Sequence, residues 1–417
     1  MSQRRLFPWR LQAQLFLIVG MGLAAGALAL LRSGWTPGPL PLSPLDPIFA
    51  LVWGLGAACA IGAAMQAKFH RVAALIMVGG VGLVTCLTFA WFSAPDLALT
   101  QIAVEVVTLV LILLGLRWLP RRIEIYDARR TSVRARARRA RDFVVALAAG
   151  VGAAALTFAV TTRPSTSELA QYFLANAWEQ AGGLNVVNVM LVDFRGFDTL
   201  GEITVVCIVA ISVYALLRRF RPAPESMEDT GVHERMEIEA QAVAAANNPL
   251  PAGPMRTPAV LVRLLLPLGG LVSAYLLLRG HNAPGGGFVG GLVSATAVIA
   301  QYMVGGTIWV EARLRVHPLV WIGLGLLAAA GAGIVGWWDS LPFLTPQGVD
   351  FHLPLVGHVH LSTVLLFDLG VYTLVVGATL LMLVALAHQG LRNPRKTVTP
   401  AVPDLDGDGL LAGAEAN

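Results

Sequence analysis

The sequence predicts an all-α membrane protein that crosses the bilayer with about ten helices, and three observations lead to this fold class. Apolar residues make up 56% of the 417 residues and charged residues only 13%, which is about half the charged share of a soluble domain. The mean hydropathy is +0.68. Long apolar runs recur along the chain, and basic residues alternate between the loops that join them. This composition argues against a water-soluble enzyme and indicates no nucleic-acid partner.

Ten apolar runs reach the roughly 20 residues that a spanning helix requires. Because backbone amides in lipid must be paired within the segment, each run is predicted to be a helix. The first run follows Arg4 and Arg5, as in a secretory signal, but its apolar length from Leu15 to Leu31 favours a retained span. The predicted spans are residues 12–31, 48–67, 72–92, 94–119, 143–160, 200–217, 259–279, 287–310, 316–337 and 361–388.

The Lys and Arg residues predict the orientation of these spans. Of the 30 basic residues, all but four fall at the two termini or in loops that would share their side of the membrane. The four on the opposite side are Arg32, Arg163, Arg195 and Arg279. By the positive-inside rule, both termini are expected in the cytoplasm.

Three segments outside the spans have a composition of their own. Residues 120–142 are dense in arginine and are expected at the cytoplasmic headgroups, where anionic lipid attracts basic side chains. Residues 222–258 are acidic, Ala-rich and Pro-containing, and are predicted to be a cytoplasmic linker between two hydrophobic modules. Residues 391–417 are predicted to be a disordered acidic tail, because the calcium-loop pattern from Asp404 to Glu415 lacks flanking helices.

Glu105 is the candidate for a proton relay. It lies ten residues after Pro95, which at the α-helical rise places it about 15 Å into its span. Gln101 and Thr108 are expected on the same helix face. A charge at this depth is costly and is seldom present without a role. A static, hydrogen-bonded structural Glu is the alternative.

Asp96 and Asp368 are further candidates for the ion path, and each also has a structural interpretation. Asp96 follows Ser93 by three residues, so the two fit a helix start with Ser93 as the N-cap. Asp368 lies about six residues past a predicted cap at Ser362, or roughly 9 Å into the last span. Tyr372 is its expected hydrogen-bond partner, and a tether to a neighbouring helix is the structural alternative.

A second acidic group precedes the sixth span, on the side predicted to face outward. Asp193, Arg195 and Asp198 lie close together in the sequence, and Thr199 with Glu202 fits a capping box. Such a group either pairs internally or concentrates cations at a membrane entrance. We keep Asp193, Asp198 and Glu202 as candidates for the ion path.

The turn from Arg279 to Gly291 is rich in glycine and joins the seventh and eighth spans. Its glycines allow backbones to approach closely. A gating or entry role is one interpretation for His281, Pro284 and Phe288, and a tight outer turn is the other.

Cofactor and metal sites are not expected. The cysteines lie singly in apolar runs, and the outer histidines near residue 355 have no cysteine or close acid beside them. The sequence has no nucleotide-binding glycine motif of either common type. Energy is therefore expected from an ion gradient or from another chain.

Three blocks of the sequence resemble components of Mrp-type multisubunit cation/proton antiporters. APDLALTQIAVE, within residues 48–142, resembles the C-terminal region of the large A subunit, and this region is also similar to small subunits of membrane-bound hydrogenases. NVVNVMLVDFRGFDTLGE, within residues 143–221, resembles the next part of the same large protein. RGHNAPGGGFVGGL and VGHVHLSTVLLFDLGVYTLVVGAT, within residues 259–390, resemble the B subunit. Residues 1–47 would form an N-terminal helix and loop.

The resemblance implies exchange of cytoplasmic Na+ or another monovalent cation for outside protons, in support of pH and salt homeostasis. It also implies site residues: Glu105 as the relay acid, Asp193, Asp198 and Glu202 in the second acidic motif, and Pro284, Phe288 and Asp368 in the B-type motifs. Family A subunits begin with a long antiporter-like helical unit similar to the pumping subunits of respiratory complex I. This chain has none, so a separate antiporter-like protein is expected.

We therefore expect an inner-membrane transporter subunit, not an enzyme, that works within a larger hetero-oligomer. Its expected partners are other Mrp-type subunits, monovalent cations, protons and lipid. Two alternatives remain. One is a structural scaffold in which Glu105 and Asp368 anchor helices, and the other is a component of a hydrogenase or related redox-driven complex.

Overall fold

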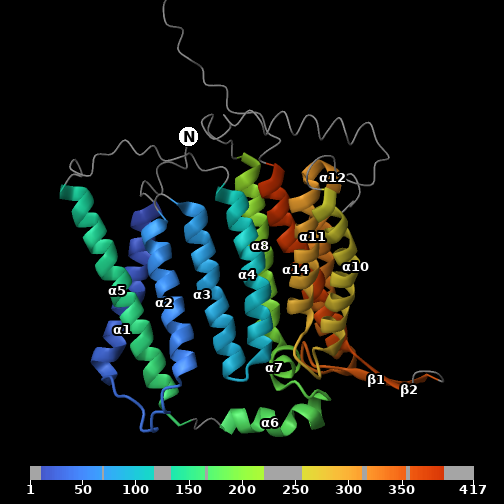
Figure 1. The fold of residues 1–417 in the computed structure, drawn as a ribbon. Coiled ribbons are helices and arrows are strands. Elements are labelled where there is room, and N and C mark those ends of the chain that lie inside the picture. The colour runs from blue at the N-terminus through green and yellow to red at the C-terminus, as the bar shows by residue number, and fades with distance from the viewer. Residues whose placement is uncertain are drawn as a thin grey trace, which may run out of the picture. The chain divides into compact units, whose positions relative to one another are not determined.

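The computed structural model describes residues 11–67, 70–116, 133–164, 168–219, 256–311, 317–353 and 357–388. Within these ranges, ten helices are long and apolar enough to cross a membrane (Figure 1), which confirms the predicted helical, multi-pass class. The placement of both termini in the cytoplasm stays a prediction. The spans are α1 (Leu11–Ser33), α2 (Pro47–Gln66), α3 (Arg71–Trp91), α4 (Pro95–Leu116), α5 (Val133–Thr161), α8 (Gly196–Arg219), α10 (Arg256–Arg279), α11 (Gly287–Gly305), α13 (Pro318–Val335) and α14 (Thr363–Ala387).

Two of the predicted boundaries are wrong by more than a turn. α5 begins at Val133, inside the segment predicted to be a basic loop. Arg and Ala both favour helix, so the chain stays helical beyond the apolar run. α11 ends at Gly305 rather than near residue 310, and Gly306, at φ +74°, separates it from the short α12 (Thr307–Glu311). The predicted linker up to residue 255 and the predicted tail lie outside the described residues.

Several elements between the spans are additions to the predicted fold. The segment before α8 contains α6 (Glu168–Ala181), α7 (Val186–Val189) and the π-helical turn η2 (Met190–Phe194). After α13 come the short helix η4 (Gly336–Asp339) and an antiparallel hairpin of β1 (Gly348–Leu353) and β2 (Gly357–Ser362). Apolar and polar residues alternate in both strands, which is the period of a strand. The all-α class therefore holds for the membrane part, with one hairpin added.

The chain divides into two compact units, residues 1–53 with 122–172 and residues 54–121 with 173–417. In the first unit, α1 packs against α5. The loop after α1 is held at the end of α5, where the backbone N–H of Leu40 donates to the carbonyl of Thr162 at 3.0 Å. The Gly38 N–H donates to the hydroxyl of the same Thr162 at 2.8 Å.

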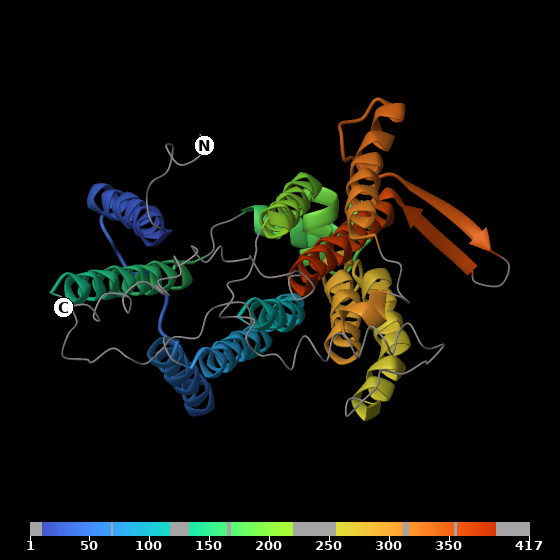
Figure 2. The ribbon, with the colours of Figure 1, turned by 90° about the horizontal axis from the view of Figure 1, so that it is seen from above.

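In the second unit, α14 is the central helix. It packs against α4, α8, α10, α11 and α13, and the view in Figure 2 shows it among α8, α11 and α13. Two thirds (67%) of its apolar window is buried, compared with none of the α1 window. The side chains of Phe367 and Leu374 are fully enclosed in this core. A carboxylate on the buried part of α14, such as Asp368, therefore faces protein rather than lipid.

Candidate functional site

The second unit contains a cavity of about 270 Å³ between α4, the α7–η2–α8 segment, the start of α11, and α14. Most of its wall is apolar, with Leu97, Val187 and Phe288 among the lining residues. The polar side chains that line it are Asp96, Thr100, Asn188, Thr199, Glu202 and Asp368. Three carboxylates predicted from separate parts of the sequence thus converge on one space.

Asp368 enters the cavity wall from α14. The residue is 8% exposed, and its Oδ1 accepts a hydrogen bond of 2.8 Å from the backbone N–H of Gly287, the first residue of α11. Gly286, at φ +98°, makes this approach possible, because L side chains rarely adopt that conformation and a Cβ there would press on the Asn188 amide. Asp368 is therefore held by the turn that precedes α11.

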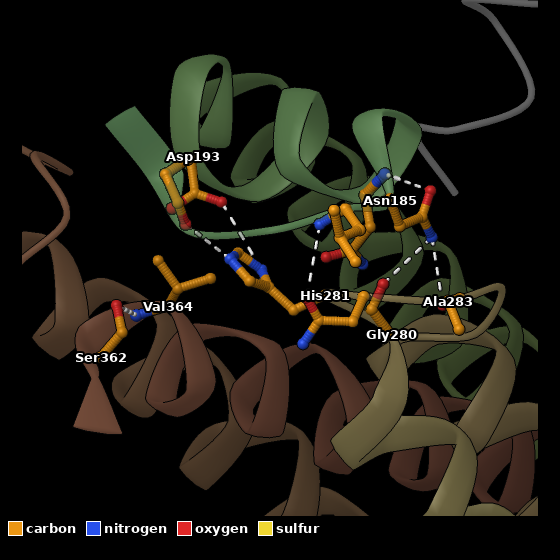
Figure 3. Close-up of polar contacts among 11 residues, drawn as sticks. Asn185, Asp193, Gly280, His281, Ala283, Ser362 and Val364 are labelled. Carbon is orange, nitrogen blue, oxygen red and sulfur yellow. Dashed lines mark hydrogen bonds and ion pairs between the residues drawn. The ribbon is translucent and has the colours of Figure 1, made fainter. Parts of the chain in front are cut away.

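The expected hydrogen bond from Tyr372 to Asp368 is wrong. The Tyr372 hydroxyl instead lies 2.6 Å from the Ser294 hydroxyl and accepts from Ser273 at 3.1 Å. One turn along α14 rotates Tyr372 toward α10 and α11. The predicted N-cap at Ser362 is confirmed, since its hydroxyl accepts from the Val364 N–H at 3.2 Å (Figure 3).

Asp96 also has partners far away in the sequence. Its Oδ1 accepts from the Asn185 side-chain amide and from the Gly285 N–H, both at 3.1 Å. The Asn185 amide also reaches the carbonyls of Gly280 at 3.0 Å and Ala283 at 3.2 Å (Figure 3). Together, Asp96 and Asn185 clasp the turn between α10 and α11.

The helix-start interpretations of the acidic residues do not hold. α4 begins at Pro95, so Ala94 rather than Ser93 occupies its N-cap position. α8 begins at Gly196, so Thr199 and Glu202 lie inside the helix, and the Thr199 hydroxyl donates to the Leu191 carbonyl at 2.8 Å.

The second acidic group separates into three environments. Asp198 pairs with Arg195, and both side chains are exposed. Glu202 lines the cavity, and Asp193 turns inward, with only 3% of its side chain exposed. The π-helical turn η2 causes this separation, because it changes the angular spacing of residues between Asp193 and α8.

Asp193 faces His281, a residue predicted for gating (Figure 3). The Asp193 Oδ2 lies 3.8 Å from the His281 Nδ1, and the His281 Nε2 lies 2.7 Å from the Ala181 carbonyl. Burial, and then the nearby negative charge of Asp368, raise the pKa of Asp193 to about 7. Of the other predicted gating residues, Pro284 is partly buried in the turn, and Phe288 lines the cavity.

Glu105 lies elsewhere, where α4 packs against α3. Its Oε2 accepts from the Gln101 amide at 3.4 Å, one turn earlier on the same helix. Its carboxylate rests directly on Gly82 of α3, where a Cβ would overlap it. Thr108 is exposed, so the predicted polar stripe includes Gln101 and Glu105 but not Thr108 as a contact. The described residues that line the cavity do not include Glu105.

Sequence reasoning missed the amides and hydroxyls of this site. Asn185 was the strongest available signal, because an Asn directly before an apolar segment is typical of an N-cap, and its Oδ1 does accept from the Asn188 N–H at 3.4 Å. Asn188 and Thr100 gave no signal beyond their residue type. Their role depends on which helices pack together.

Three family models match consecutive parts of the chain. They describe the D subunit of MBH (MbhD) over residues 55–121, the E subunit of MBH (MbhE) over residues 137–234, and a "Domain related to MnhB subunit of Na+/H+ antiporter" over residues 257–381. The cavity receives Asp96 from the first match, Glu202 from the second and Asp368 from the third.

Individual relatives agree with these matches. The Na(+)/H(+) antiporter B subunit of Bacillus subtilis (strain 168) is 40% identical over 119 residues, which cover 28% of this chain and 83% of that protein. The chain belongs to the family of Mrp-type cation/proton antiporter subunits. The "Probable K(+)/H(+) antiporter" A/B subunit of Rhizobium meliloti (strain 1021) is 51% identical over 97% of this antiporter-family chain and 41% of the relative.

The fold of this antiporter-family chain is also found in a solved complex. One chain of the "Structure of Mrp complex from Dietzia sp. DQ12-45-1b" matches with a TM-score of 0.70 and 30% identity, over 94% of this chain and 40% of that one. The chain thus spans about two fifths of the length of both long relatives. It combines a region like the end of the A subunit with a region like the B subunit.

Proposed function

We propose that the chain is an inner-membrane component of an Mrp-type complex that exchanges a monovalent cation for protons, and that it supplies part of the ion path. It would act as part of a secondary transporter and not as an enzyme. The observation that supports this proposal most strongly is the convergence of Asp96, Glu202 and Asp368 on one cavity. Each comes from a different family-matched block.

The chemistry of the cavity suits both kinds of cargo. Carboxylate, amide and hydroxyl oxygens are the ligands that hard cations prefer, and Asp96, Asn188 and Thr199 supply one of each. A carboxylate can instead take a proton, so a proton and a cation compete for the same negative charge. A space of about 270 Å³ accommodates several water molecules, so a cation can enter partly hydrated.

Glu105 is proposed as a proton relay separate from the cavity. It is only half-buried between α3 and α4 and has a single side-chain partner, Gln101. Such a carboxylate can release its proton without breaking a tertiary network. Ionisable groups inside spans mark proton pathways in many membrane proteins.

Other subunits are proposed to complete the complex, among them a separate antiporter-like protein. The chain covers only 41% of its long relative. Many large apolar side chains on α1, α2 and α5 are exposed, and surfaces of this kind contact lipid or a neighbouring protein. The names of the relatives include both K+ and Na+, so both cations belong in the test.

A scaffold function is the second candidate, and a specific observation favours it. Asp96 and Asp368 both accept hydrogen bonds from backbone N–H groups in the α10–α11 turn. In that case the carboxylates hold the turn and carry no ion. Substitution by Asn separates the two functions, because Asn keeps an oxygen acceptor for the turn but removes the charge.

The test compares Asp368→Asn with Asp339→Asn in the assembled complex. Asp339 is an exposed carboxylate in η4, outside the cavity lining. Proton exchange driven by Na+ or K+ is measured in membrane vesicles, and assembly is measured by copurification. An ion path predicts that Asp368→Asn assembles but loses exchange on the order of a hundredfold, while Asp339→Asn does not. Normal exchange in assembled Asp368→Asn would contradict the ion path and favour the scaffold.

A further inference from the structure

His281 has one tautomer available in its neutral form. Its Nε2 lies 2.7 Å from the backbone carbonyl of Ala181, and a carbonyl can only accept a hydrogen bond. Nε2 therefore carries the hydrogen. The other nitrogen, Nδ1, is then an unprotonated acceptor, and it is the atom that faces Asp193 at 3.8 Å.

The Asp193 carboxylate has an unsatisfied atom at the same place. Its Oδ2 is buried and has no hydrogen-bond partner among the described residues, while 3% of the side chain is exposed. An ionised Asp193 opposite a neutral His281 would place two acceptors face to face. One added proton resolves this, either on Nδ1 or on Oδ2, because each atom then donates to the other.

We propose that His281 and Asp193 bind one shared proton, and that this proton competes with the cation in the adjacent cavity. The inference rests on the proposed function. Without the proton, the pair carries one negative charge; with it, the pair is neutral in total, whichever atom holds the proton. The negative pair favours a cation beside Asp368, and the neutral pair does not. Proton uptake by His281 and Asp193 would thus release the cation.

The charges around the pair are predominantly negative. Asp368 on α14 is near enough to raise the pKa of Asp193 by its charge. Asp96 on α4 binds the same turn through Asn185, and Glu202 on α8 lines the cavity. Arg195, the cation next to Asp193 in sequence, is exposed and paired with Asp198, and Arg279 at the end of α10 contacts Tyr275. Neutralisation of the pair therefore depends on a proton.

The shared proton has a route to water. The His281 side chain is 27% exposed, whereas Asp193 beneath it is 3% exposed. A proton that reaches the imidazole occupies Nδ1, and its transfer breaks the Nδ1–H bond and forms an O–H bond on Asp193. His281 therefore connects the solvent to the buried carboxylate.

The experiment measures the cation concentration for half-maximal exchange in the assembled complex between about pH 5 and pH 8. In the wild-type complex this concentration should fall about fivefold or more as pH rises, because the pair becomes negative. Asp193→Asn stays neutral, so the fall should vanish at the weak-binding value. His281→Gln removes one of the two proton positions and should move the midpoint to lower pH.

His388→Gln is the matched control. His388 also contacts a carboxylate, with its Nε2 2.8 Å from Glu311 Oε1, but both side chains are partly exposed and neither lines the cavity. Its pH profile should match wild type. An unchanged profile in assembled Asp193→Asn, or an unchanged midpoint in His281→Gln, would overturn the proposal. If Asp193→Asn fails to assemble, His281→Gln decides alone.

Infrared difference spectra of the purified complex test the shared proton independently of transport. A protonated carboxyl band that titrates near neutral pH should disappear in Asp193→Asn and shift in His281→Gln. Absence of such a band, together with an unchanged ring signal from His281, would exclude the shared proton. If the wild-type complex shows no exchange while this band is present, the proposed function fails and the proton-binding pair stands.

Discussion

Glu105 and Asp368 are both carboxylates inside spanning helices, yet their surroundings differ in kind. Glu105 is half-buried, and its side-chain partner Gln101 lies one turn away on α4. Asp368 is 8% exposed, and its partner Gly287 lies 81 residues away. The first site needs only the packing of α3 on α4, whereas the second needs four segments to meet.

This difference teaches how each carboxylate can work. A carboxylate with local partners can change its protonation while the fold stays fixed, which suits a relay. A carboxylate held by the backbone of another block senses the position of that block, which suits coupling between an ion and the protein. The predictions below separate these two behaviours, beginning with the largest expected effect.

Gly287→Val should prevent stable assembly. A Cβ at Gly287 would overlap the backbone carbonyl of Asp368, and overpacking of a tight contact costs about 1–3 kcal/mol or more. Gly270→Val is the matched control, because a Cβ at Gly270 on α10 meets no atom within 4 Å. Yield and melting temperature of the purified complex measure the effect. Equal melting of the two variants would show that the α11–α14 contact is not tight.

Glu105→Gln should assemble and lose proton exchange by roughly a hundredfold. Gln retains the shape of the side chain and can still hydrogen-bond to Gln101, but it has no titrating group. Exchange in vesicles and copurification measure the two effects separately. Normal exchange by the assembled variant would remove the relay role, whereas lost assembly would favour the structural alternative.

Gly82→Ala should impair exchange without removing any charge. The added methyl group would displace the Glu105 carboxylate, which rests on Gly82, and misplacement of a reacting group costs on the order of ten- to a hundredfold. The control is Gly115→Ala, on the same helix as Glu105 but with no atom within 4 Å of the new Cβ. If both variants exchange like wild type, the position of Glu105 on α3 is unimportant.

Asp193→Asn should change how stability depends on pH. The folded protein raises the pKa of Asp193 from 3.8 to about 7, so it favours the protonated form. The stabilisation from that form is complete below the ordinary value, declines as pH rises, and is lost above about pH 7. Relative to wild type, the variant's melting temperature should therefore rise by a few degrees between about pH 5 and pH 8. A constant difference would mean that Asp193 does not titrate in the fold.

Tyr372→Phe should have the smallest effect. It removes the hydroxyl that contacts Ser273 and Ser294, and such buried hydrogen bonds contribute about 1 kcal/mol to stability. Thermal melting measures this loss. Exchange should persist because Tyr372 does not contact Asp368 through its hydroxyl. An exchange defect as large as that of Asp368→Asn would indicate that the two residues act together.

The sequence predicts the spans and the key carboxylates well, and for a clear reason. Apolar length alone identifies spanning helices, and a charge such as Glu105 or Asp368 is conspicuous inside an apolar run. The partners of these charges are harder to predict. The Gly287 N–H and the Asn185 amide reach their acceptors across 81 and 89 residues, so their role follows from helix packing that a single sequence does not encode locally.

The acidic segment before α8 shows a second kind of difficulty. Asp193, Asp198 and Glu202 are close in sequence and were predicted as one group, but the π-helical turn η2 sends them in different directions. Helical spacing of 3.6 residues per turn does not apply across such a turn. The hairpin of β1 and β2 was missed for a simpler reason, because only apolar run length was considered there.

Cysteine accessibility tests the central claim, that the cavity is an aqueous cation site, most directly. Thr100 on α4 lines the cavity, and Thr88 on α3 does not. Each donates its hydroxyl to the carbonyl four residues earlier at 2.8 Å, so Cys substitutions at these positions are matched. Both are made in a background in which Cys59, Cys86 and Cys207 are replaced by Ser.

The measurement is the rate at which a small, water-soluble maleimide labels each cysteine in open membrane fragments, with K+, Na+ or a large organic cation present. The account predicts that Thr100→Cys is labelled and that K+ or Na+ slows its labelling, whereas Thr88→Cys is insensitive to the cation. Labelling of Thr100→Cys that is absent, or that proceeds at the same rate whichever cation is present, would contradict it.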